Sequence, residues 1–160
     1  MQLSNWQQQN AITLIASDGD EETEYRVTFK TMTAYDEAVF NRKRAKAFGI
    51  LEDVFGPADD RDEETVENAI ALLDIMVKHA AIMASLGSVE RKNGKGWIPD
   101  RLPEIWYDAK EFAYHAPHSV LNHLFEAAID AGNPMQVFSF APLGEAEKKT
   151  LRIHVHPSEN

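Results

Sequence analysis

Hydrophobic and polar residues near the start of the chain follow a pattern that predicts a β-hairpin. Residues 11–16 (AITLIA) and 24–30 (EYRVTFK) are rich in strand-forming residues, and an acidic segment with a glycine separates them. In the second run Tyr25, Val27 and Phe29 alternate with polar residues, as in a strand with one buried face. We therefore expect two antiparallel strands here.

The pattern then changes to a helical spacing. Thr33 stands at an N-cap position with Asp36 three residues later, and apolar residues recur at helical spacing up to Gly49. From Gly49 to Glu64 no period persists, so we expect a solvated loop or a short helix there. This stretch, 49–64, is also where the single domain expected for residues 1–160 could be subdivided.

The strongest helical signal is the segment 65–86 (TVENAIALLDIMVKHAAIMASL), which we call the hub helix. It is apolar on nearly every side, and Gly87 stands where a helix often ends. The segment is long enough to span a bilayer, but Glu67, Asp74 and Lys78 would each cost about 2–3 kcal/mol or more there. We therefore expect a buried helix or one side of an apolar groove.

After the hub helix the pattern predicts a turn and two further helices. Asn93 and Gly94 form a hairpin-type turn, with Trp97 and Ile98 as an apolar anchor on the returning limb. A helix is then expected to start at Pro103.

The break at 115–117 (His-Ala-Pro) opens the last predicted helix, and Gly132 closes it. Two alternating runs, Met135–Ala141 and Thr150–His156, predict a C-terminal β-hairpin. The fold class expected from these elements is α+β, with about four helices between two hairpins.

Composition narrows the class of protein. The chain has 160 residues, 44% of them hydrophobic, and no cysteine, which excludes disulfides and every cysteine-based metal site. Residues 1–10 are polar, so no secretory signal is expected from them.

Charge is distributed unevenly along the chain. The net charge is −10, and residues 1–80 hold 16 of the 26 acidic residues but only half of the basic ones. The acids gather at 18–24 (DGDEETE) and 59–67 (DDRDEETVE), with a short basic run at 42–46 between them. Because phosphate binding needs many bases together, no nucleic-acid groove is expected.

Three groups of ionisable residues are candidate chemical sites. His154 and His156 share one face of a predicted strand, but nothing nearby supplies a third metal ligand. The second group clusters around a predicted helix start and comprises His115, His118 and His123, the last of which lies three residues before Glu126. Loop and cap positions explain these histidines, and His79 is expected at the polar edge of the hub helix.

The third group consists of Glu104, Asp108 and Glu111, which fall on one face of the helix expected after Pro103. Paired carboxylates can act as acid and base in a cleft, but a solvated stripe is the simpler interpretation. The segment 94–96 (GKG) lacks the remaining glycine and the helix start of a phosphate loop. We therefore predict a protein that is not an enzyme and that needs no cofactor and no metal.

The order of segments along the chain is distinctive. It runs from the hairpin ITLIASDGDEETEYRVTF through the helix TAYDEAVFNRKRAKAF and the acidic linker to the T-V-E-x-A-I start of the hub helix, and then to GKGW and LPEIW. This layout, over roughly residues 11–130, resembles that of tail assembly chaperones of long-tailed bacteriophages. The resemblance implies binding of a hydrophobic tape-measure protein in the host cytoplasm and recruitment of tube subunits.

Candidate partner-binding residues are apolar side chains that are exposed or line a groove, and we predict Met76, Met83, Trp97 and Trp106. The expected partner is a phage tail protein, bound by a homo-oligomer or within an assembly, with neither nucleic acid nor membrane involved.

Other interpretations stay open. The chain could be a virion subunit of the tail or of the head–tail connector, with terminal strands that pair with neighbours. It could also be an acidic inhibitor that mimics nucleic acid, or a small hydrolase built on the histidine and carboxylate groups.

Overall fold

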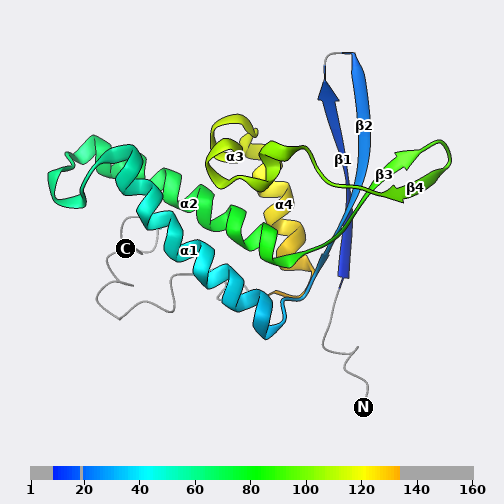
Figure 1. Ribbon diagram of the computed structural model, residues 1–160, viewed down its shortest axis with the longest axis horizontal. Helices are drawn as coiled ribbons and strands as arrows, with labels where there is room; N and C mark the ends of the chain where they lie inside the picture. Colours follow the sequence, from blue (N-terminus) through cyan, green and yellow to red (C-terminus); the bar gives the residue numbers. More distant parts are fainter. Residues whose placement is uncertain (1–8, 19, 134–160) are drawn as a thin grey trace.

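The computed structural model describes residues 9–18 and 20–133, and the fold consists of one sheet covered on one side by helices (Figure 1). Four antiparallel strands lie in the order β1-β2-β3-β4. The strands are β1 (Gln9–Asp18), β2 (Glu21–Lys30), β3 (Leu86–Asn93) and β4 (Gly96–Pro99). The helices are α1 (Ala34–Phe55), α2 (Glu63–Ser85), α3 (Ala109–His115) and α4 (His118–Asp130), with short 3-10 turns η2 (Ala58–Asp60) and η3 (Glu104–Tyr107).

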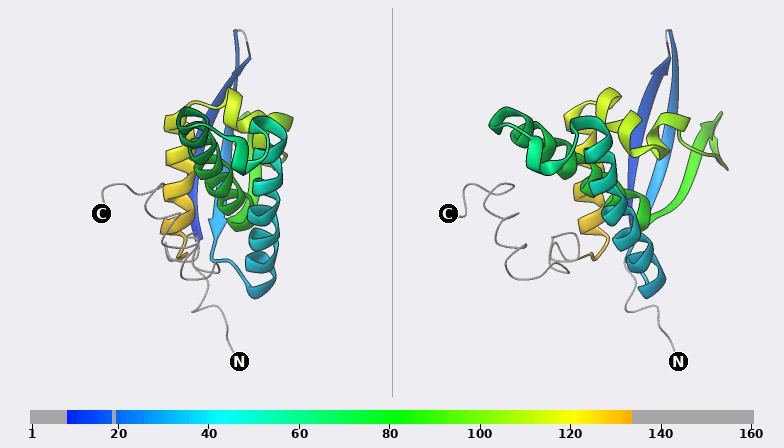
Figure 2. Two further views of the ribbon diagram at one scale, coloured as in Figure 1. Left: turned by 90° about the vertical axis from the view of Figure 1, so that its left-hand side faces the viewer. Right: turned by 60° about the vertical axis from the view of Figure 1, so that its left-hand side comes forward.

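Helix α2 lies at the centre of the helical layer, with α1 and α4 on its two sides (Figure 2). One core cluster joins α2 to α1 and includes Phe40, Leu73 and Met76. The other joins α2 and α4 to the inner face of the sheet, where Val27 and Phe29 are fully buried. Burial of α2 against both neighbours therefore organises the core, as its apolar pattern predicts.

The α+β fold class is confirmed, with an N-terminal hairpin and four helices, one of which is long and apolar. The hairpin forms with a regular register from Gln9 opposite Lys30 to Asp18 opposite Glu21. Thr33 and Asp36 form a reciprocal capping box at the start of α1, and the Thr33 hydroxyl accepts from the Asp36 amide at 3.2 Å.

The expected end of the first helix at Gly49 is wrong, because α1 continues to Phe55. Leu51 is buried, and Val54 and Phe55 pack on the same core. Contact with α2 therefore stabilises six more helical residues. The helix ends instead at Gly56, whose φ of 78° lies in the left-handed region.

The acidic run at 59–67 is also not simply a loop. Asp62 caps α2, accepting from the Thr65 amide at 2.7 Å, and Glu63 and Glu64 occupy the first turn. Acidic side chains are favoured there by the partial positive charge of a helix N-terminus. The hub helix consequently begins two residues earlier than its apolar pattern indicates.

Gly87 does not end the hub helix as predicted. Helix α2 stops at Ser85, and β3 begins at the next residue, so Gly87 lies within a strand. A Cβ atom at Gly87 would lie 2.8 Å from the Thr28 carbonyl oxygen of the neighbouring strand. The glycine is therefore explained by close approach of two backbones, and not by helix termination.

The single helix expected after Pro103 is divided in two. Residues 104–107 form η3, and Asp108 then caps α3 by accepting from the Glu111 amide at 2.9 Å. Asp108 is thus a cap rather than part of one carboxylate stripe. The turn at Asn93 and Gly94 and the closure at Gly132 are confirmed, with φ values of 63° and 92° at the two glycines. The predicted C-terminal hairpin, Met135–Ala141 and Thr150–His156, lies outside the described residues.

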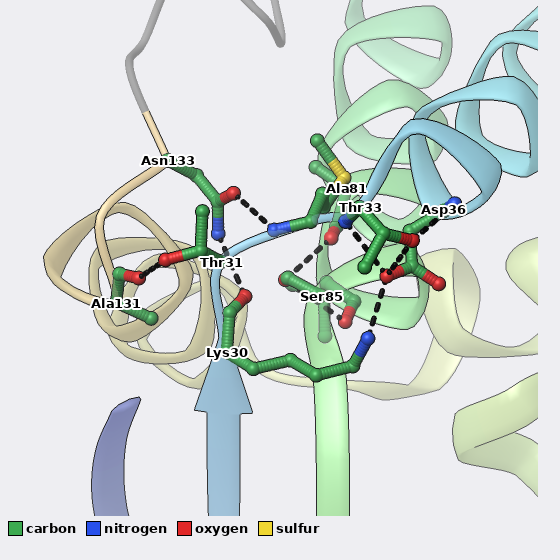
Figure 3. A network of polar contacts seen from close by, with 10 residues as sticks. Lys30, Thr31, Thr33, Asp36, Ala81, Ser85, Ala131 and Asn133 are labelled. Carbon is green, nitrogen blue, oxygen red and sulfur yellow. Dashed lines mark hydrogen bonds and ion pairs between the residues drawn. The ribbon is translucent and has the colours of Figure 1, made fainter. Parts of the chain in front are cut away.

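Asn133 ties the end of α4 to the connection between β2 and α1 (Figure 3). Its side chain is buried, accepts from the Met32 amide at 2.8 Å, and donates to the carbonyls of Lys30 and Ala128 at 3.0 and 2.9 Å. The Thr31 hydroxyl adds a bond to the Ala131 carbonyl. Two segments a hundred residues apart are therefore held together by the Asn133 amide and the Thr31 hydroxyl.

Two glycines provide a matched test of this geometry. Gly49→Ala should raise the free energy of unfolding by about 0.5–1 kcal/mol, because the position is helical and its surroundings are open. Gly87→Ala should lower it by about 1–3 kcal/mol, because the new methyl group meets a backbone carbonyl. Urea unfolding measures both, and equal effects would contradict the assignment.

Asn133→Ala should lower the free energy of unfolding by about 2–4 kcal/mol, since it removes three hydrogen bonds and leaves the Met32 amide without this acceptor. Asn122→Ala on α4 is the control and should change it by about 0.5 kcal/mol or less. A small effect at Asn133 would show that other contacts hold the connection.

Candidate functional site

A hollow of about 170 Å³ lies where α1 and α2 meet the segment from η3 to α3. Its lining is mostly apolar, with two lysines and one histidine. The lining residues are Lys43, Lys46, Ala47 and Ile50 of α1, Met76, His79 and Ala80 of α2, and Tyr107 and Ala109. We call this the α1–α2 hollow. Engineered cavities of about 150 Å³ hold a benzene-sized group, so one aromatic or branched apolar side chain fits.

His79 is the buried polar group of the α1–α2 hollow, with only 3% of its surface exposed. Its Nε2 atom lies 2.8 Å from the Trp106 carbonyl oxygen, and its ring centroid is 5.0 Å from that of Phe112. The expectation that His79 sits at a polar edge is wrong, because η3 covers this side of α2.

Burial lowers the pKa of His79, since the charged imidazolium loses its solvation. The bond to the Trp106 carbonyl acts in the opposite direction, and the nearby Lys43 ammonium lowers the pKa further. The neutral ring must carry its proton on Nε2 to donate to a carbonyl, which leaves Nδ1 as an acceptor.

The basic run at 42–46 is divided between surface and core. Lys43 and Lys46 are exposed and line the hollow, whereas Arg44 is buried. The Arg44 guanidinium lies 5.3 Å from the Phe40 ring centroid and donates to the Asn41 side chain at 3.0 Å. Burial lowers its pKa. Two of the four basic residues therefore supply positive charge to an apolar hollow in an acidic chain.

The four predicted partner-binding residues are not brought together. Met76 lines the hollow but is 2% exposed, so it belongs mainly to the core. Trp106 contributes its carbonyl to His79 and packs its ring 5.7 Å from Phe112.

The other two predicted residues lie near or in the sheet. Met83 is half-buried against the core between the helices and the sheet. Trp97 lies under the Arg26 guanidinium at 4.6 Å, on β4. Their role in binding remains a prediction, and only Met76 shares a site with the lysines.

Of the nine lining residues, only Met76 was predicted from the sequence as a binding residue; Lys46, Tyr107 and Ala109 are among those that the sequence did not indicate. The lysine was visible as part of the basic run, but its nearness to Met76 and His79 depends on how α1 packs on α2. No local pattern gives the position of Tyr107, which follows from the 3-10 turn.

Among residues 9–18 and 20–133, no group of three or more histidines and acidic residues could hold a metal ion. Glu111 pairs with His115 at 3.3 Å across one helical turn, and both side chains are largely exposed. His154 and His156 lie outside the described residues.

Helix α2 is the one segment in the described part of the chain that is long and apolar enough to cross a membrane. Of its most apolar window, 61% is buried inside the fold, which is typical of a core helix.

Comparison with known proteins gives no relative: no family model, curated protein or solved structure matches the chain.

The lowered pKa of His79 predicts a pH dependence of stability. As the pH falls below 6.5, the unfolded chain takes up a proton on this residue that the folded chain does not, so the free energy of unfolding falls. One proton accounts for at most about 1.4 kcal/mol per pH unit. His79→Gln should flatten the slope of unfolding free energy between pH 7.5 and 5.

Denaturant unfolding across that range measures the slope. The control is His123→Gln, an exposed position on α4, which should keep the slope of the unsubstituted protein. If the two variants behave alike, burial of His79 is not the source of the dependence.

Proposed function

We propose that this chain is a non-enzymatic assembly chaperone or scaffold that binds apolar helical segments of a tape-measure-like tail protein of a long-tailed phage, in the host cytoplasm. The observation that carries the proposal is the α1–α2 hollow, an apolar recess with lysines among its lining residues. The order of elements along residues 11–130, described above, supports the phage assignment.

The lining suits an apolar side chain presented by a helix. Ile50, Tyr107 and Ala109 are half-buried and offer apolar surface, whereas Met76 and Ala80 are buried and close the inner end of the hollow. A recess for one large side chain is typical of helix-in-groove recognition, in which a few apolar anchors enter pockets.

Lys43 and Lys46 complement such a helix. Their aliphatic stems can cover apolar surface while their ammonium groups stay in water. Positive charge at the hollow favours the C-terminal end of a bound helix, where carbonyl groups are unpaired, or an acidic residue beside the anchor. The rest of the surface is acidic overall, which favours solubility of a protein that binds apolar segments.

The nucleic-acid mimic receives less support from the geometry. Asp62 is used as a helix cap, and Glu63 and Glu64 complement the start of α2, so part of the second acidic run has a local structural role. Among residues 9–18 and 20–133 the hydrolase alternative gains little, since Glu111 and His115 pair on an exposed surface.

Co-expression with the tail protein tests the proposal. The chain should keep a tape-measure segment soluble and elute with it in size-exclusion chromatography. Ala109→Leu, which fills the hollow, and Lys46→Glu, which cancels the positive charge of its lining, should each weaken binding by about tenfold or more.

The matched control is Arg42→Glu, which makes the same charge change at an exposed position of α1 that does not line the hollow. It should leave binding nearly unchanged. An insoluble tail protein and no complex would refute the chaperone assignment. Finding the chain in purified particles by mass spectrometry would favour a virion subunit instead.

A further inference from the structure

The two edges of the sheet are built differently. Strand β4 has four residues, follows a turn containing Lys95, and ends at Pro99, which has no amide to donate. Strand β1 has ten residues, and its register with β2 runs without a bulge from one end to the other. It contains no proline, lysine or arginine.

Edge strands of soluble proteins are usually short, charged, bulged or covered, because their free amides and carbonyls can pair with another strand. Strand β4 has such protection, and β1 has none of it in its own sequence. Within the described part of the chain β1 pairs only with β2, so alternate residues along its ten-residue length direct their amides and carbonyls to a side without a partner strand. Ile15 is 62% exposed on this strand, which adds apolar surface beside the free side.

We propose that β1 pairs with β1 of a second copy of this chain, antiparallel and about a two-fold axis at Thr13 or Leu14. With the axis at either residue, each side chain lies opposite one from the same face of the sheet. With the axis at Thr13, Ile12 lies opposite Leu14 of the second copy on the helix-covered face; with the axis at Leu14, Thr13 lies opposite Ile15 of the second copy on the other face. The two sheets become one continuous eight-stranded sheet with both helical layers on one side.

Charge selects the antiparallel arrangement. The turn end of the hairpin is acidic, with Asp20, Glu21 and Glu22 all exposed. Antiparallel pairing places the two acidic ends at opposite ends of the joint, whereas parallel pairing would bring them together at a cost in repulsion. Two chains that each carry −10 can approach along β1 because the strand itself is nearly uncharged.

The same lack of charge argues for a second copy over a foreign strand. Nothing along Gln9–Ser17 offers a charge that would select an oppositely charged partner. A two-fold joint instead uses the same uncharged edge twice, as isologous interfaces do.

Oligomeric state over a range of concentrations gives the first test. Sedimentation velocity of the full chain should show a species of twice the 18.0 kDa monomer mass. Thr13→Lys should raise the dissociation constant by about tenfold or more, because two ammonium groups are brought together at the joint. Ser88→Lys makes the same charge change at an exposed position of β3 and should leave the dimer intact.

A monomer at every concentration would overturn the proposal, and so would a dimer that Thr13→Lys does not weaken. Circular dichroism of each variant shows whether it is folded. Because the hollow and β1 share no residue, binding of the tail protein can fail while the dimer persists, or the reverse.

Cysteine cross-linking gives the second test, since the chain has no cysteine of its own. Opposed residues of antiparallel strands have Cα atoms about 4.5–5.5 Å apart, within the range of a disulfide. Thr13→Cys should cross-link with itself if the axis is at Thr13, or with Ile15→Cys if it is at Leu14.

Ser17→Cys should not cross-link with itself in either case, because Gln9 or Ala11 lies opposite it. Cross-linking of Ser17→Cys with itself would indicate parallel or unspecific pairing and would overturn the proposed joint. Absence of any cross-link at Thr13 or Ile15 would do the same.

Discussion

The burial of α2 is the constraint on which the rest of the structure depends. A helix with so little polar surface is stable in water only if other elements cover it on several sides. Helix α1 covers one side, α4 covers another, and the inner face of β2 and β3 lies beneath its C-terminal end. The two hairpins of the sheet in turn depend on packing against the helices, because a two-stranded hairpin alone is only marginally stable.

The direct passage from α2 into β3 fixes the relation between the two layers. With no loop between Ser85 and Leu86, the direction of the helix sets the position of the strand. The close approach of Gly87 to Thr28 is a result of this tight connection. On the outer face of the sheet, Arg26 pairs with Glu90 and Lys92 with Glu24, so charged side chains face away from the helices. Such exposed pairs add little stability, and they keep that face polar.

The sequence predicts well those features that depend on residues close together along the chain. The capping box of Thr33 and Asp36, the turn at Gly94 and the apolar run of α2 each depend on residues a few positions apart. Where a tertiary contact competes with a local signal, the prediction fails. Gly49 would end an isolated helix, but packing of Leu51 on α2 extends it, and His79 is covered by a segment 27 residues later. The hollow has the same origin, because its lining comes from three separate segments.

The hydrogen bonds of Asn133 have a consequence for how the chain folds during its synthesis. They join residues 101 and 103 positions apart, and a bond from Asn10 to the Ala127 carbonyl spans 117. A chain leaving the ribosome can form β1, β2 and α1 early, but it lacks α4 and Asn133 until nearly all the described residues have been made. During that interval the inner face of the hairpin is uncovered along with its free edge, a combination that exposes nascent chains to premature association. Synthesis past residue 133 therefore ends the interval in which this face and this edge are exposed together.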